Sequence, residues 1–153
     1  MSELSNYKEI IDGIFTVAQK NTFVNAVQHA IDASFDQNKE VRYVLDMYIP
    51  YFQTDQILSL AQSLHVDLRN QETASSFYKE LLNVLNQLKE VDLTIAYTPN
   101  YDQIKRIAEW WRKEVDPYII LNLKFDRDLI AGAIVGYDGV SKNVSLREHM
   151  RLN

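Results

Sequence analysis

The side chains that most often perform chemistry are scarce in this sequence, and their spacing does not form a familiar set. Cysteine is absent, and the three histidines are His29, His65 and His149. Thiolate catalysis, iron–sulfur clusters and cysteine-based zinc sites are therefore excluded. No two histidines are four residues apart, so none forms a helical metal pair. Each lies among polar neighbours of a predicted helix, which favours a partly exposed surface position.

Asp126 and Asp128 are the pair of residues that most resembles an acid–base or metal site. Arg127 separates them in a segment that joins two predicted strands, and aspartate is a preferred turn residue. We therefore interpret this pair as turn-forming. The glycines near the end of the chain lack the spacing of a dinucleotide-binding loop or a P-loop, and no G-x-S-x-G motif occurs. The sequence predicts no catalytic residue, no cofactor and no metal.

Aromatic side chains gather at two places that could contact a partner. Trp111 shares the apolar stripe of a predicted helix and is expected in the core, whereas Trp110 lies about 100° around the helix axis. Trp110 either contacts a partner or folds over its own helix. A second group surrounds Pro50, and we expect it to lie in the core at one end of the helices. That group is Tyr43, Tyr48, Tyr51 and Phe52.

The composition limits the class of protein that could hold these residues. The 153 residues suffice for one domain or two small ones, and 46% hydrophobic with 24% charged residues excludes disorder. Lys and Arg number 16 and Asp and Glu 21, a net charge of −5 that disfavours nucleic acid and anionic lipid as partners. Four glycines and three prolines are too few for an all-β fold. The sequence contains no run of about 18 apolar residues, the length that would span a membrane. Met1–Lys20 also lacks the apolar core of a signal peptide.

Apolar residues recur at three- and four-residue spacing through most of residues 1–90, which predicts amphipathic helices. The first stripe runs from Tyr7 to Val17, and Asn21-Thr22 is the expected N-cap of the second helix. Pro50 ends the third helix, Thr54 is expected to cap the fourth, and the fifth begins near Gln71. Five helices with one apolar face each predict an antiparallel bundle.

After residue 90 the spacing changes to that of strands. The expected elements are a strand over Val91–Tyr97, a helix over 104–115, strands over 118–123 and Leu129–Tyr137, a hairpin turn at Asp138-Gly139, a short strand around Asn143-Val144 and a terminal helix from Ser145. The strand–helix–strand order favours a parallel pair, and the hairpin makes the sheet mixed. We expect an α+β fold: an N-terminal antiparallel helical bundle in residues 1–90, then a small α/β region with a mixed sheet in 91–153.

The segment from Asp126 to Val135, with Gly139 and the segment from Asn143 to Arg147, resembles the C-terminal signature of the δ subunit of F-type ATP synthases. The mitochondrial relative of that family is the oligomycin-sensitivity-conferring protein. The matching positions are Asp126, Leu129, Ile130, Gly132, Gly139, Ser145, Leu146 and Arg147. The departures from the family pattern are Arg127 for proline, Ala131 for glycine and Asn143 for aspartate.

This resemblance implies a non-catalytic subunit of the peripheral stalk, or stator, which links the catalytic head to the membrane-anchored b stalk during proton-driven ATP synthesis. The implied partners are the N-terminal helices of the head's α subunits and the b subunit. The implied location is the cytoplasmic face of the cell membrane, with attachment only through partners. Within the signature, Leu129 and Ile130 are expected to start a buried strand, and Gly139 is expected to supply the positive φ of a hairpin.

Two sets of residues are candidates for these contacts. A groove that would receive an amphipathic helix is expected at Tyr7, Ile11, Ile14, Phe15, Phe77 and Leu81. Contact with the stalk is expected at Trp110, Arg147 and Met150. Two alternatives remain open: an unrelated helical adaptor or regulatory binding protein, and a small enzyme that uses Asp126, Asp128 and His149.

Overall fold

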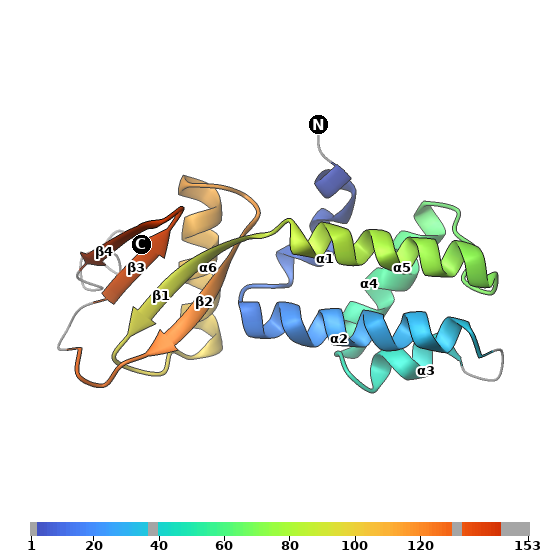
Figure 1. Ribbon diagram of the computed structural model, residues 1–153, viewed down its shortest axis with the longest axis horizontal. Helices are drawn as coiled ribbons and strands as arrows, with labels where there is room; N and C mark the ends of the chain where they lie inside the picture. Colours follow the sequence, from blue (N-terminus) through green and yellow to red (C-terminus); the bar gives the residue numbers. More distant parts are fainter. Residues whose placement is uncertain (1–2, 37–39, 130–132, 145–153) are drawn as a thin grey trace. The chain divides into compact units, whose positions relative to one another are not determined.

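The computed structural model describes residues 3–36, 40–129 and 133–144. The chain forms two compact units, each with its own core (Figure 1). The first unit is Met1–Ile14 with Gln19–Gln87, and the second is Phe15–Ala18 with Leu88–Asn153. The fold is α+β, as the sequence predicts, with a helical first unit and a small mixed sheet in the second.

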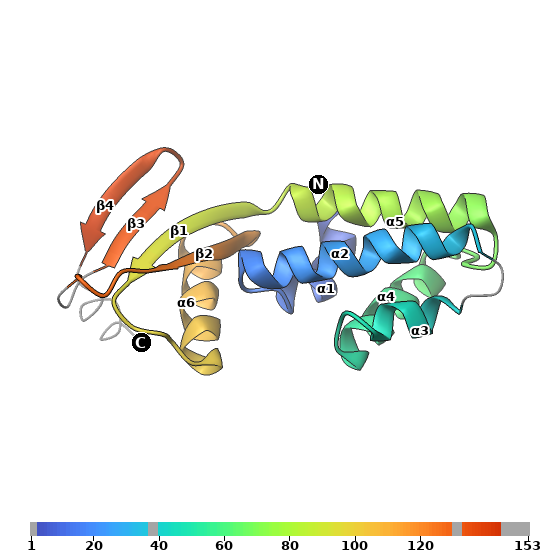
Figure 2. The same cartoon turned by 60° about the horizontal axis from the view of Figure 1, so that its bottom comes forward.

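The first unit is built from helices whose apolar stripes face one another. Its elements are the 3-10 helix η1 (Glu3–Tyr7) and the α-helices α1 (Lys8–Asp12), α2 (Val17–Ser34), α3 (Val41–Asp46), α4 (Tyr51–Ser63) and α5 (Gln71–Asn86). Figures 1 and 2 show α2 and α5 side by side and running in opposite directions. Phe23 of α2, Leu45 of α3, Ile57 of α4 and Leu81 of α5 are almost completely buried and form part of the core.

Helix boundaries in the first unit follow the sequence at some points and depart from it at others. The predicted start of α5 at Gln71 is confirmed, and the Asn70 side chain caps it by accepting the N–H groups of Glu72 and Thr73. Thr54, predicted as an N-cap, lies inside α4 instead. That helix begins one turn earlier because the carbonyl of Pro50 already accepts the N–H groups of Gln53 and Thr54.

The start of α2 also differs from the prediction. Asn21 and Thr22 lie within α2, which begins at Val17, and the single first helix expected through Val17 ends at Asp12. The interruption includes Phe15, whose carbonyl accepts the N–H of Leu121 in the second unit rather than bonding within a helix. A tertiary contact therefore sets this boundary.

The second unit contains a four-stranded sheet and one covering helix in the part of the chain that is described. Its elements are β1 (Lys89–Ile95), α6 (Tyr101–Glu114), β2 (Ile119–Phe125), β3 (Ala133–Tyr137) and β4 (Val140–Val144). The strand order is β2-β1-β3-β4, with β1 and β2 parallel and the other neighbours antiparallel. The predicted parallel pair and the predicted mixed sheet are both confirmed.

Helix α6 packs against one face of this sheet. Ala108 of α6 shares a buried cluster with Val91 of β1 and with Ile119 and Leu121 of β2. The helix begins with a capping box. The Asn100 side chain accepts the backbone N–H of Gln103, and the Gln103 side chain accepts the backbone N–H of Asn100, both with N···O distances of 2.9 Å. Because β3 pairs with β1 and not with β2, the predicted turn at Asp126 does not join neighbouring strands.

The boundary between the units lies at Gln87 and Leu88, close to the division that the sequence predicts at residue 90. Phe15–Ala18 is the exception, because these four residues, which include the first two of α2, belong to the second unit although the rest of α2 belongs to the first. Among the residues that the structure describes, no helix combines the length and the hydrophobicity needed to cross a bilayer.

Candidate partner-binding surfaces

The residues predicted to line an open groove are mostly part of the first unit's core. Side-chain burial is nearly complete for Tyr7, Ile11, Ile14, Phe77 and Leu81, all of which are at most 5% exposed. The segment that holds the first three packs onto the bundle, with η1 against α5 and α1 against α4. The prediction of an exposed groove at these residues is therefore wrong, because the apolar stripes cover one another.

Phe15, also predicted for that groove, lies in the second unit. Its side chain is 4% exposed and joins the buried cluster beneath α6. The ring meets Tyr101 edge-on with 5.9 Å between ring centres, and the guanidinium carbon of Arg112 lies 5.5 Å from the ring centre. The Phe15 carbonyl accepts the Leu121 N–H at 2.8 Å, and Thr16 forms a parallel bridge to Leu121. Phe15 therefore anchors the Phe15–Ala18 segment to β2 and is part of the second unit's core.

Trp110, predicted to meet the stalk, is half-buried on α6. Its ring is perpendicular to that of Trp111, with 5.4 Å between ring centres. Trp111 packs against the buried cluster and against Tyr137, and it is half-buried rather than fully buried. Arg147 and Met150 lie outside the described residues.

The first signature residue, Asp126, forms a turn at the end of β2. Its carboxylate accepts the N–H of Asp128 at 3.0 Å, and its own N–H donates to the carbonyl of Ile95 at 2.9 Å. The first of these bonds confirms the predicted turn-forming role, and the second connects the turn to the end of β1. Leu129 is not in a strand, because β3 begins only at Ala133. Among the other signature positions, Ile130, Gly132, Ser145, Leu146 and Arg147 lie outside the described residues.

The hairpin between β3 and β4 carries the last of the described signature positions. Gly139 has φ 77° and Asp138 has φ 52°, the two positive values that a two-residue hairpin turn requires. A Cβ atom added at Gly139 would meet no atom within 4 Å, so the backbone conformation rather than space explains the glycine. The predicted role of Gly139 is confirmed.

The two histidines among the described residues lie in different surroundings. His29 is half-buried and stacks on Tyr48, with 4.3 Å between ring centres, and His65 is exposed at the end of α4. His149, which the enzyme alternative requires, lies outside the described residues. Within the described ranges no three histidine or acidic side chains are grouped to hold a metal ion.

Three of the four aromatic residues around Pro50 are exposed, where the sequence predicted core, and the fourth, Tyr48, is half-buried. The structure exposes Tyr43 by 68%, Tyr51 by 70% and Phe52 by 56%, and Met47 beside them by 61%. We call these four residues the α3–α4 patch. The missed signal is that Tyr43 and Met47 are one helical turn apart, off the stripe of α3 that includes Val44 and Leu45. That spacing gives α3 a second apolar face. Only the face with Val44 and Leu45 packs into the core, so the second face is exposed.

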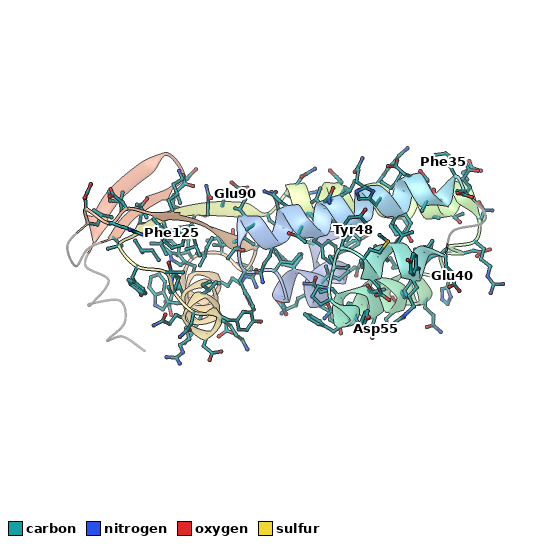
Figure 3. All side chains as sticks on the ribbon, turned by 90° about the horizontal axis from the view of Figure 1, so that it is seen from below. Phe35, Glu40, Tyr48, Asp55, Glu90 and Phe125 are labelled. Carbon is teal, nitrogen blue, oxygen red and sulfur yellow. The ribbon has the colours of Figure 1, made fainter. Side chains whose placement is uncertain are left out.

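Charged side chains surround this patch and fasten its two helices together. Arg42 of α3 binds Asp55 of α4, with an N···O distance of 2.6 Å, and lies 3.7 Å from Asp46. The hydrogen bond and the charge of Asp55 raise the pKa of Arg42. Glu40 is also exposed at the start of α3 (Figure 3). Among the described residues from Glu40 to Asp55, three carboxylates and one guanidinium leave an excess of negative charge.

The second unit has a polar surface on the sheet face opposite α6. A cavity of about 530 Å³ lies there and is lined in part by Glu90, Asp92, Lys124 and Asp138. The Asp92 carboxylate accepts a hydrogen bond from Asn122 at 2.8 Å and lies 4.0 Å from Lys124. Mixed and antiparallel sheets often keep one face in water, and these paired side chains are typical of such a face.

An ion pair joins the start of β1 to the turn before β2. Lys89 Nζ and Asp116 Oδ2 are 2.6 Å apart. Burial opposes the ionisation of Asp116, but the hydrogen bonds from Lys89 and from the Tyr118 N–H outweigh it and lower the pKa of Asp116. The same hydrogen bond raises the pKa of Lys89. Both groups are therefore charged at neutral pH, and the pair connects the start of β1 to the turn that precedes β2.

A comparison with models of protein families gives no match, and a comparison with curated proteins gives none either.

Proposed function

We propose that this protein is a non-catalytic subunit of the peripheral stalk of a rotary F-type ATP synthase. In this proposal the first unit binds N-terminal helices of the head's α subunits, and the second unit binds the membrane-anchored b subunit. The protein would then hold the head against rotation and would meet the membrane, at its cytoplasmic face, only through these partners. No cofactor is required for that task.

The observation that carries the proposal is the order and topology of the two units. A helical unit precedes a sheet built in the order strand, helix, strand, strand, strand. The signature residues Asp126 and Gly139 form a turn at the end of β2 and the hairpin between β3 and β4. This arrangement supports the resemblance to the δ subunit. The turn at Asp126 and the hairpin at Gly139 are local structural features that members of one family would share.

The exposed α3–α4 patch adds support of a different kind. Four large apolar side chains exposed within ten residues of the chain are costly in water unless a partner covers them, and aromatic and methionine side chains are enriched at protein interfaces. A binding subunit needs such a surface. The patch would equally serve the adaptor alternative, so partner identity must come from experiment.

The test is direct binding of the whole purified chain to both partners. The probes are a synthetic N-terminal peptide of the α subunit and a C-terminal fragment of the b subunit, each taken from the genome that encodes this chain. We expect each probe to bind in isothermal titration calorimetry, and we expect both to bind at once because they use different units.

A peptide of the same composition as the α-subunit probe but of scrambled order is the matched control, and we expect it not to bind. If neither stalk nor head probe binds under conditions where the chain is folded, the stator function is rejected in favour of the adaptor alternative.

A further inference from the structure

We propose that the α3–α4 patch is a docking surface for an amphipathic helix of a partner chain that carries lysine or arginine along its polar edge. Only the identity of that partner chain rests on the proposed function. The chemistry of the surface does not depend on the proposed function. The surface also differs from the groove that the sequence predicted, whose residues are buried.

The apolar part of the surface has the composition of a binding hot spot. Tyr43, Met47, Tyr51 and Phe52 are each more than half exposed, and they fall within ten residues of the chain. Tyrosine is enriched among the residues that dominate binding energy, and methionine and phenylalanine are enriched at interfaces. Covering them would remove apolar area from water without any change in the core beneath.

The surface is held in place before a partner arrives. Val44 and Leu45 of α3, Ile49 of the connecting turn and Ile57 of α4 are buried below it. The Arg42–Asp55 contact joins α3 to α4 at 2.6 Å. Little ordering of the backbone would therefore accompany binding, and preorganised surfaces lose less affinity to entropy.

The charges around the patch select the kind of partner. Glu40, Asp46 and Asp55 lie within or beside the same stretch of α3 and α4, and Arg42 is already engaged with the two aspartates. The excess of negative charge repels nucleic acid, anionic lipid and a second copy of the same surface, and it attracts a positively charged edge. The exposed apolar side chains also require an apolar face on the partner, next to that positively charged edge. An amphipathic helix with a basic edge meets both requirements.

The test uses two fluorescently labelled synthetic peptides with the same leucine face, one with lysine and the other with glutamate on its polar edge. Binding to the whole chain is followed by fluorescence anisotropy. We expect the lysine peptide to bind at least about tenfold more tightly than the glutamate peptide. We expect the double variant Tyr51→Ser with Phe52→Ser to weaken binding of the lysine peptide by about tenfold or more.

Phe35→Ser is the matched control, because Phe35 is 61% exposed in the same unit but lies outside the patch. We expect its affinity for the lysine peptide to equal that of the unchanged chain. All three changes are at exposed positions, where substitutions usually leave folding intact. Equal binding of the two peptides, or unchanged binding to the double variant, would overturn the docking surface. If the unchanged chain forms a dimer and the double variant does not, the surface binds a second copy of this chain, and the proposed partner helix is wrong.

The α-subunit peptide in the same assay separates this proposal from the proposed function. If the lysine peptide binds at the patch and the α-subunit peptide does not bind, the docking surface stands and the stator function falls. If the α-subunit peptide binds the double variant as tightly as the unchanged chain, the stator function stands and the α subunit is not the partner that binds the patch.

Discussion

Tyr78 places a hydroxyl group in the core of the first unit. The residue is 0% exposed, and its oxygen has no hydrogen-bond partner among the described residues. Burial raises the pKa of Tyr78 above its ordinary value of 10.0, because a phenolate would lose its hydration there. An unpaired buried hydroxyl costs free energy of folding, so the ring rather than the oxygen stabilises this position.

Removing that oxygen is therefore expected to be harmless or favourable. Tyr78→Phe keeps the ring and should leave the free energy of unfolding unchanged or raise it by up to about 1 kcal/mol. Because the pKa of Tyr78 is higher in the folded state, this group contributes to the free energy of unfolding below pH 10.0, and that contribution is lost as the pH rises above 10.0. The unchanged chain should lose stability in that alkaline range through this group, and the variant should not.

Urea unfolding followed by far-UV circular dichroism, at neutral and at alkaline pH, measures both effects. Tyr43→Phe is the matched control, since Tyr43 is 68% exposed and its hydroxyl is in water. A loss of more than about 1 kcal/mol in Tyr78→Phe would mean that the hydroxyl has a partner after all.

At the scale of elements, the Phe15–Ala18 segment covers the outer edge of the sheet. Strand β2 is the first in the sheet order, and an exposed edge strand is open to pairing with other chains. Thr16 bridges Leu121 of β2, and Arg112 of α6 donates from Nε to the carbonyl of Ile119 at 2.9 Å. Phe15 secures this cover through its burial beneath α6.

Truncating that anchor should destabilise the second unit. Phe15→Ala is expected to lower its free energy of unfolding by about 3–5 kcal/mol, the usual cost of emptying a buried phenylalanine site. Both tryptophans of the chain lie in α6, so intrinsic tryptophan fluorescence in urea reports this unit. Phe125→Ala is the control, because Phe125 is 55% exposed and should lose far less. An unaltered fluorescence transition in Phe15→Ala would show that the ring contributes nothing to the core.

At the scale of the whole molecule, the chain is divided into two units, and the short segment Phe15–Ala18 belongs to the second although the sequence on both sides of it belongs to the first. Each unit buries its own apolar cluster, and the chain passes between them at Ile14, at Ala18 and at Gln87. A subunit that connects two different partners gains from such a division, because each surface can be built on a separate core.

Two separate cores should give two unfolding transitions. Tryptophan fluorescence follows the second unit, whereas far-UV circular dichroism is dominated by the helices of the first. We expect the two signals to change at different urea concentrations in the unchanged chain. Superimposable curves from both probes would indicate one cooperative body and would contradict this expectation.

The sequence by itself determined the features that depend on neighbours a few residues apart. The start of α5 at Gln71, the strand β1 and the positive φ at Gly139 were all predicted correctly, because capping, alternation and turn geometry are local. The change from helices to strands near residue 90 gave the α+β fold for the same reason.

Only the tertiary structure decided which apolar surfaces are covered. Phe15 looked like part of a helix stripe, but pairing with β2 removed it from the first unit's helices. Leu81 lies in the core although the sequence placed it in an open groove, and Tyr51 is exposed although the sequence placed it in the core. Spacing reveals that a residue lies on an apolar face, whereas burial depends on whether a distant segment packs against that face.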